Sequence, residues 1–182
     1  MSLTREEVEP GVVRLRFRSW QGQLVGYEVS AYVVRGVLVD TGFSHARRAL
    51  VAALDDIAPR AAIVTHWHED HAGNVEALAR RGLPIRLHAT AEATLRARPS
   101  IGTYRHFVWG QSPRLTTPLV EADIAPLEVL PLPGHTADHV AVWDAERRIL
   151  VSGDLFLGVK VRVAHRHEEP RRLLASLKTA AA

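Results

Sequence analysis

The chain has 182 residues, 47% of them hydrophobic, which is typical of a globular protein, and we expect residues 1–182 to form a single domain. Its 23 basic and 20 acidic residues leave a formal charge of +3 without a run of five like charges, so no nucleic-acid-binding tail is indicated. Cysteine is absent, which excludes disulfides and thiolate metal ligands. The polar N-terminal residues and the lack of an apolar run of about 18 residues predict a cytoplasmic protein with no membrane partner.

The first third of the chain has the patterns of strands followed by a helix. Apolar and arginine side chains alternate in the first predicted strand, which indicates a half-buried strand with a basic outer face. Arg35 and Gly36 form a turn between the second and third strands. Ser44 can cap the helix, and Pro59 stops it. The predicted strands are 11–18, 27–34 and 37–39, and the predicted helix is 44–57.

A short apolar stretch at 61–64 is followed by four side chains that can bind a metal. On extended backbone, His66, His68 and Asp70 share one side, and His71 points elsewhere. On a helix, His66 and His68 would diverge, because residues two apart lie about 200° around the axis. Imidazole and carboxylate are ligands that zinc accepts. We therefore predict a buried strand that continues into an extended metal-binding loop.

The rest of the chain alternates strand and helix patterns, which favours an α/β layer structure. The segment 99–123 interrupts this rhythm with prolines and aromatic residues, and we expect it to be irregular, either a wall over the site or a plain surface excursion. Isolated histidines are expected to be structural or at the surface, namely His45, His88, His106, His165 and His167. Helices are predicted at 74–81, 90–98 and 168–178, and strands at 83–88, 127–132, 139–143, 149–152 and 159–163.

The hexapeptide from His66 to His71, His-Trp-His-Glu-Asp-His, resembles the signature of the metallo-β-lactamase-fold hydrolases. Three further motifs follow the order of that family: Asp40-Thr41-Gly42, Pro133-Gly134-His135-Thr136 and Ser152-Gly153-Asp154. The resemblance implies an αββα sandwich. The family supplies one more histidine ligand from a loop near the end of the fold. No residue after His167 matches it, so we expect a truncated sandwich that lacks its C-terminal strand and helix.

The resemblance also implies a site for two metal ions. Asp154 bridges the two ions, and Asp40 supports the metal loop without binding metal. Two zinc ions are expected, although one ion, iron or manganese is not excluded. The implied ligands are His66, His68 and His135 at the first ion, and Asp70, His71 and Asp154 at the second.

The implied function is hydrolysis of a small-molecule ester, thioester, lactone or amide by hydroxide held on zinc, which attacks the carbonyl carbon. Asp70 is expected to orient the nucleophile and pass on its proton. His139 is the second candidate catalytic residue: it either donates a hydrogen bond to a substrate oxygen or buttresses Asp138.

Four positions differ from the zinc β-lactamases, which the stretch from Gly134 to Leu150 otherwise resembles. Those enzymes have Arg, Asn, Cys and Lys where this chain has His71, His139, Asp154 and Leu157. β-Lactamase activity is therefore an alternative rather than the first hypothesis. The other alternative functions are sulfur oxidation at a single iron, nuclease activity and a non-catalytic metal-binding domain. A nuclease is disfavoured because the sequence has no Lys/Arg patch with interleaved aromatic residues.

Overall fold

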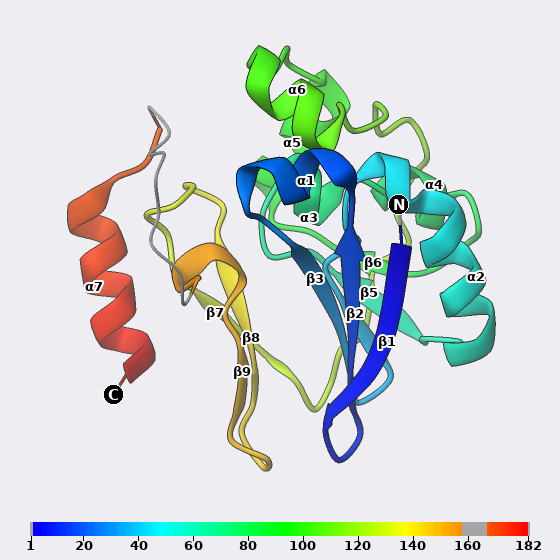
Figure 1. Ribbon diagram of the computed structural model, residues 1–182. Helices are drawn as coiled ribbons and strands as arrows, with labels where there is room; N and C mark the ends of the chain where they lie inside the picture. The colour runs from blue at the N-terminus through cyan, green and yellow to red at the C-terminus, as the bar shows by residue number, and fades with distance from the viewer. Residues whose placement is uncertain (1, 158–166, 182) are drawn as a thin grey trace.

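The computed structural model describes residues 2–157 and 167–181. Two β-sheets face each other, and helices cover the outer face of each sheet (Figure 1). The predicted α/β class and the αββα order of layers are confirmed. The predicted strand 159–163 and His165 lie outside the described residues. In the described part of the chain, no helix is long and apolar enough to cross a membrane.

The first sheet has six strands in sequence order. Its first four strands pair antiparallel, and β5 and β6 join in parallel, so the last three strands all end at the same edge of the sheet. That shared edge is where the metal-binding motif begins. The strands are β1 (Ser2–Glu9), β2 (Val12–Arg18), β3 (Val29–Val34), β4 (Val37–Val39), β5 (Ala61–Ile63) and β6 (Ile85–Arg86).

The second sheet is an antiparallel meander of β7 (Glu128–Pro131), β8 (Val140–Asp144) and β9 (Ile149–Val151). Valine, isoleucine and alanine side chains fill the space between the two sheets. At one end of this interface, Arg35 donates two hydrogen bonds to Asp144, with Nε to Oδ2 at 2.7 Å and Nη2 to Oδ1 at 3.2 Å. This planar, bidentate pair ties the sheets together.

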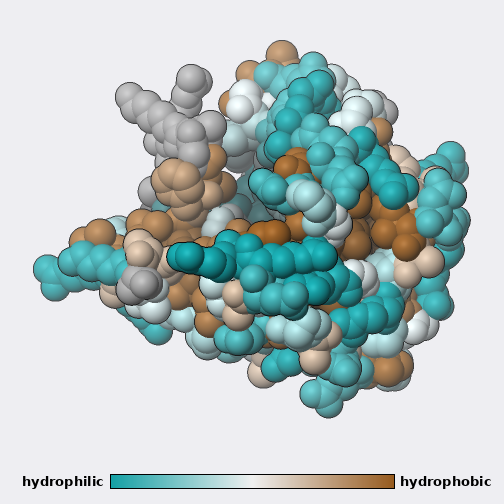
Figure 2. Space-filling view, turned by 90° about the horizontal axis from the view of Figure 1, so that it is seen from below, coloured by the Kyte–Doolittle hydropathy of each residue, from teal (hydrophilic) through white to brown (hydrophobic). Residues whose placement is uncertain are grey.

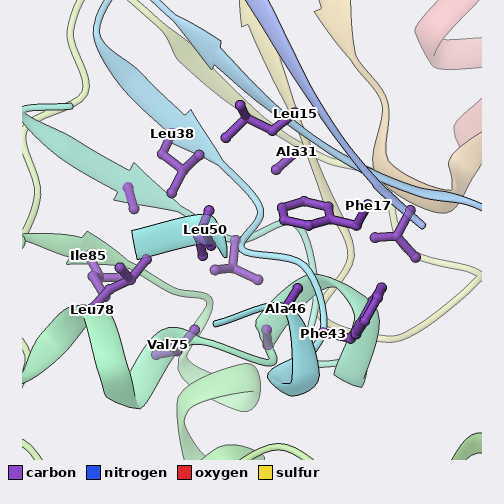
Figure 3. Packing of buried hydrophobic residues seen from close by; sticks show 14 of the residues in the cluster. Leu15, Phe17, Ala31, Leu38, Phe43, Ala46, Leu50, Val75, Leu78 and Ile85 are labelled. Carbon is purple, nitrogen blue, oxygen red and sulfur yellow. The ribbon is translucent and has the colours of Figure 1, made fainter. Parts of the chain in front are cut away.

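The main hydrophobic core lies between the first sheet and its helices. Phe17, Leu38, Phe43 and Leu50 are fully buried there (Figure 3). On the opposite side, Leu173 of α7 packs against the outer face of the second sheet. The helices are α1 (Trp20–Val25), α2 (Arg47–Ile57), α3 (Glu69–Ala72), α4 (Val75–Ala79), α5 (Ala89–Ala97), α6 (Thr103–Trp109) and α7 (Pro170–Ala181), with 3-10 turns at Ser44–Ala46 and Gly153–Leu155.

Most of the predicted elements are present, with four differences. The polar segment that forms β1 was not predicted as a strand, because as an exposed edge strand it has no apolar face to reveal it. The helix α1 was not predicted either. The expectation of an irregular 99–123 is wrong where α6 forms and buries Val108 and Trp109. Ser44 does not cap α2, since a 3-10 turn intervenes and no side-chain cap bond forms there.

Candidate metal centre

The metal-binding motif leaves β5 through a bend at residues 65–67 and turns into α3 at Glu69. His66 and His68 lie in one cluster, as predicted, but the backbone there bends instead of continuing as an extended loop. The prediction that Asp70 shares their side is wrong, because residues 69–72 form a helical turn that places Asp70 with His71. The helical turn thus divides one hexapeptide between two clusters.

The first cluster contains His66, His68, His135 and Asp154, each with one nitrogen or oxygen within 4.8 Å of the others. His135 follows β7, so the second sheet brings it to the loop of the first. Its Nε2 lies 3.0 Å from Nδ1 of His68. Nε2 of His66 is buried and has no hydrogen-bond partner among the described residues. A buried imidazole nitrogen without such a partner, converging with two further imidazoles, fits a zinc-type cation.

The second cluster contains Asp70, His71 and Asp154. Nε2 of His71 lies 3.1 Å from Oδ1 of Asp154 and 3.7 Å from Oδ2 of Asp70. The other ring nitrogen, Nδ1, lies 2.8 Å from Oδ2 of Asp40. Asp40 also accepts hydrogen bonds from the backbone N–H and the hydroxyl of Thr65, at 2.8 and 3.0 Å. Asp40 thus holds the His71 ring so that Nε2 faces the cluster, which is the supporting contact expected for Asp40.

The two clusters differ in charge. Burial and the neighbouring histidines lower the pKa of His66 well below its usual value, and burial and Arg105 do the same for His68, so both rings are neutral. Burial also opposes the charged form of His71, but the carboxylates of Asp154 and Asp40 outweigh it and raise its pKa well above normal. Neutral imidazoles are ready to bind metal, and a second cation at His71 would compensate the charge of the carboxylates around it.

His139 lies at the start of β8 and is 1% exposed. Its Nε2 accepts a hydrogen bond from the backbone N–H of Asp154 at 3.1 Å, so its Nδ1 carries the proton and donates to the carbonyl of Leu132 at 3.0 Å. Both nitrogens are occupied, which argues against the predicted bond to a substrate oxygen. The alternative partner, Asp138, instead accepts from the backbone N–H of Trp67 at 2.9 Å. His139 therefore supports Asp154.

Gly153 makes this support possible. Its φ of +53° is in the left-handed region, and an added Cβ would lie 2.8 Å from Nε2 of His139 and 2.9 Å from Oγ1 of Thr65. Any other residue would push Asp154 away from His139.

Three residues at the site were not predicted. Oε1 of Glu168 lies 3.1 Å from Nδ1 of His135, and Nε2 of His167 lies 3.0 Å from Nε2 of His68, although His167 is exposed. Arg105 of α6 forms an ion pair with Glu69 beside the metal loop. No local pattern marks these residues, because each reaches the site only through tertiary packing.

A cleft of about 900 Å³ runs past both clusters and along the space between the sheets. Aromatic and apolar side chains contribute much of its wall. The face shown in Figure 2 is hollowed, and hydrophobic and hydrophilic residues both border the hollow. Lining residues away from the clusters include Tyr27, Tyr104, Trp109, Leu155 and Phe156.

Comparison with known proteins agrees with this geometry. Residues 24–181 match the family model of the metallo-beta-lactamase superfamily, and the chain belongs to that superfamily. It is similar to a beta-lactamase-like protein 2 homolog of Caenorhabditis elegans, with 32% identity over 133 residues that cover 67% of this chain and 41% of the relative. It is also similar to a hydroxyacylglutathione hydrolase of Xanthomonas axonopodis pv. citri, with 34% identity over 125 residues that cover 68% of this chain and 41% of the relative.

The fold is that of solved metallo-β-lactamases. The crystal structure of the DIM-1 metallo-beta-lactamase superposes with a TM-score of 0.73 at 20% identity, covering 99% of this chain and 83% of the other. The chain spans about half the length of the curated relatives it matches.

Proposed function

We propose that this protein is a metal-dependent hydrolase of small acyl compounds: esters, thioesters, lactones or amides. The observation that carries the proposal is the pair of clusters, one rich in histidine and one rich in carboxylate, that share Asp154 beside the cleft. A carboxylate that belongs to both clusters would be a ligand available to either of two cations.

Each cluster would bind one cation. The ligands of the first cation would be His66, His68 and His135, and those of the second would be Asp70, His71 and Asp154. A bound divalent cation supplies Lewis acidity and lowers the pKa of water from 15.7 to about 7, which makes a nucleophile available at neutral pH. Two zinc ions are the occupants we propose, with iron as the alternative, and a cytoplasmic location stays a prediction.

Asp70 is the carboxylate placed to orient the attacking water. Its side chain is 17% exposed at the cleft, whereas the side chain of Asp40 is 4% exposed and bound to Nδ1 of His71. Burial raises the pKa of Asp70, and the nearby charge of His71 partly offsets this. A carboxylate with a raised pKa can take the proton from the nucleophile and return it to the leaving atom.

The substrate class rests on the cleft and on a relative. The name of the hydroxyacylglutathione hydrolase gives an acyl derivative of glutathione as its substrate, which is a thioester. Aromatic side chains along the cleft suit an apolar acyl group. Leu157, which lines the cleft, stands where the zinc β-lactamases have a lysine for the carboxylate of the drug, so we rank β-lactam cleavage below thioester hydrolysis.

Metal analysis combined with a substrate panel tests the proposal. Purified protein is assayed for bound metal and then for hydrolysis of a thioester, a lactone, an ester and a chromogenic cephalosporin. We expect His68→Ala to lose metal and activity together, and Asp70→Asn to lose more activity than first-site metal. His106→Ala, which alters an exposed histidine of α6, should match the wild type. A wild-type chain that takes up no metal, or full activity in either cluster variant, would overturn the proposal.

A further inference from the structure

Arg105 reaches from α6 to the metal loop, where it contacts two residues. Its guanidinium group pairs with the carboxylate of Glu69, and the side chains of Arg105 and Glu69 are only 11% and 3% exposed. Its Cζ atom lies 5.0 Å from the centroid of the Trp67 ring, a cation–π distance. One side chain therefore binds the loop through both charge and stacking.

The two contacted residues, Trp67 and Glu69, flank His68. His68 lies in the first cluster, while the side chains on either side of it both contact Arg105 of α6. Backbone hydrogen bonds also anchor the loop across the fold: the N–H of Trp67 donates to Asp138, and the carbonyl of Thr65 accepts from the N–H of Val140. Glu69 is also the first residue of α3, the turn that places Asp70 and His71. The position of Glu69 therefore affects the placement of His68 in the first cluster and of Asp70 and His71 in the second.

The helix that carries Arg105 is itself firmly placed. Val108 is fully buried and Trp109 is 8% exposed, and the Trp109 ring packs 5.6 Å from that of Phe43. The Trp20 ring of α1 stacks edge-on against Phe107 at 5.6 Å. A guanidinium held on such a helix acts as a fixed support for the loop. Among the described residues, Arg105 is the basic side chain that pairs with Glu69, so without it the buried Glu69 carboxylate would lose its charge partner.

We propose that Arg105 is a positioning residue for the metal centre, which fixes His68 and the start of α3 by holding Glu69 and covering Trp67. This inference rests on the proposed metal site but not on the proposed reaction. It predicts that metal affinity depends on a residue that touches no ligand.

The test is zinc affinity of the full chain after the metal has been stripped, measured by competition with a chelator. Arg105→Met keeps the length of the side chain but removes its charge, and we expect zinc binding about 10- to 100-fold weaker. Arg105→Lys keeps the charge without the planar fork and should fall between. Glu69→Gln combined with Arg105→Met should recover part of the affinity, because no unpaired carboxylate remains. Arg81→Met, which breaks the exposed pair with Asp55, is the matched control and should bind zinc normally.

A purely structural role for Arg105 gives a different result. In that case Arg105→Met lowers the melting temperature, but well below that temperature the folded variant binds zinc as the wild type does, and this outcome overturns the inference. If Arg105→Met does not fold, zinc affinity is measured in Arg105→Lys and Glu69→Gln instead. Wild-type zinc affinity in both variants refutes the inference. A wild-type chain that binds no zinc refutes the metal site itself, so the two failures are distinguishable.

Discussion

Replacing Asp40 by asparagine should weaken the second metal site without changing the size of a side chain. Asp40 uses one oxygen to accept from the backbone N–H of Thr65 and the other to accept from Nδ1 of His71, each at 2.8 Å. Asparagine has a single acceptor oxygen, and the backbone N–H of Thr65 can only donate to it. The amide NH2 then faces Nδ1 of His71, which must accept, so the ring proton moves to Nε2. That nitrogen is the one that faces Asp70 and Asp154, and it can no longer bind a cation.

The expected loss follows from this change of tautomer. Removing a group that orients a metal-binding histidine costs about 10- to 100-fold in affinity, or about 1.4–2.7 kcal/mol. The loss should fall mainly on the second cluster, since His71 bonds Asp40 directly, whereas His66 is linked to it only through the hydroxyl of Thr65. The first-site affinity should therefore stay within about twofold.

Calorimetric titration of the metal-stripped chain with zinc resolves the two sites. The matched control is Asp144→Asn, another buried carboxylate, which is 2% exposed and paired with Arg35 at the far end of β8. It should lower the melting temperature but leave both zinc affinities unchanged. If Asp40→Asn binds the second zinc as tightly as the wild type does, Asp40 does not set the tautomer of His71 and the reasoning is refuted.

Two further predictions concern stability and backbone geometry. Burial raises the pKa of Glu76, but hydrogen bonds from Arg80, Thr116 and Thr117 outweigh this effect and lower the pKa to about 2. The Glu76 carboxylate therefore stabilises the fold above pH 4.5, and this contribution is lost as the pH falls toward 2. After allowance for solvent screening, Glu76→Gln should cost about 1–2 kcal/mol at pH 7 in urea denaturation. A difference from the wild type that does not shrink at pH 3 would contradict this prediction. Gly153→Ala should weaken zinc binding at least about 10-fold, because its Cβ displaces Asp154. Gly26→Ala, with a similar φ of +77° and no atom within 4 Å of the added Cβ, should cost only stability, and equal zinc affinities in the two variants would argue against a role for Gly153.

Local features of this protein could be predicted from the order of its residues. Apolar alternation predicted β2, apolar stretches predicted β3 and β8, and apolar stripes at helical spacing predicted α2 and α7. The spacing of His66 and His68 predicted that they belong to one group of ligands, as they do. These features depend on backbone geometry over a few residues, which the order of side chains largely controls.

The contacts that support the site depend on long-range packing. His139 contacts Asp154 rather than Asp138 or the cleft, because the close approach at Gly153 brings the end of β9 against the start of β8. Arg105 meets Glu69 across 36 positions of sequence, from a helix that was not predicted. Contacts of this kind depend on how layers pack and on which buried charges must find partners. Those are properties of the whole fold, and no short stretch of sequence carries them.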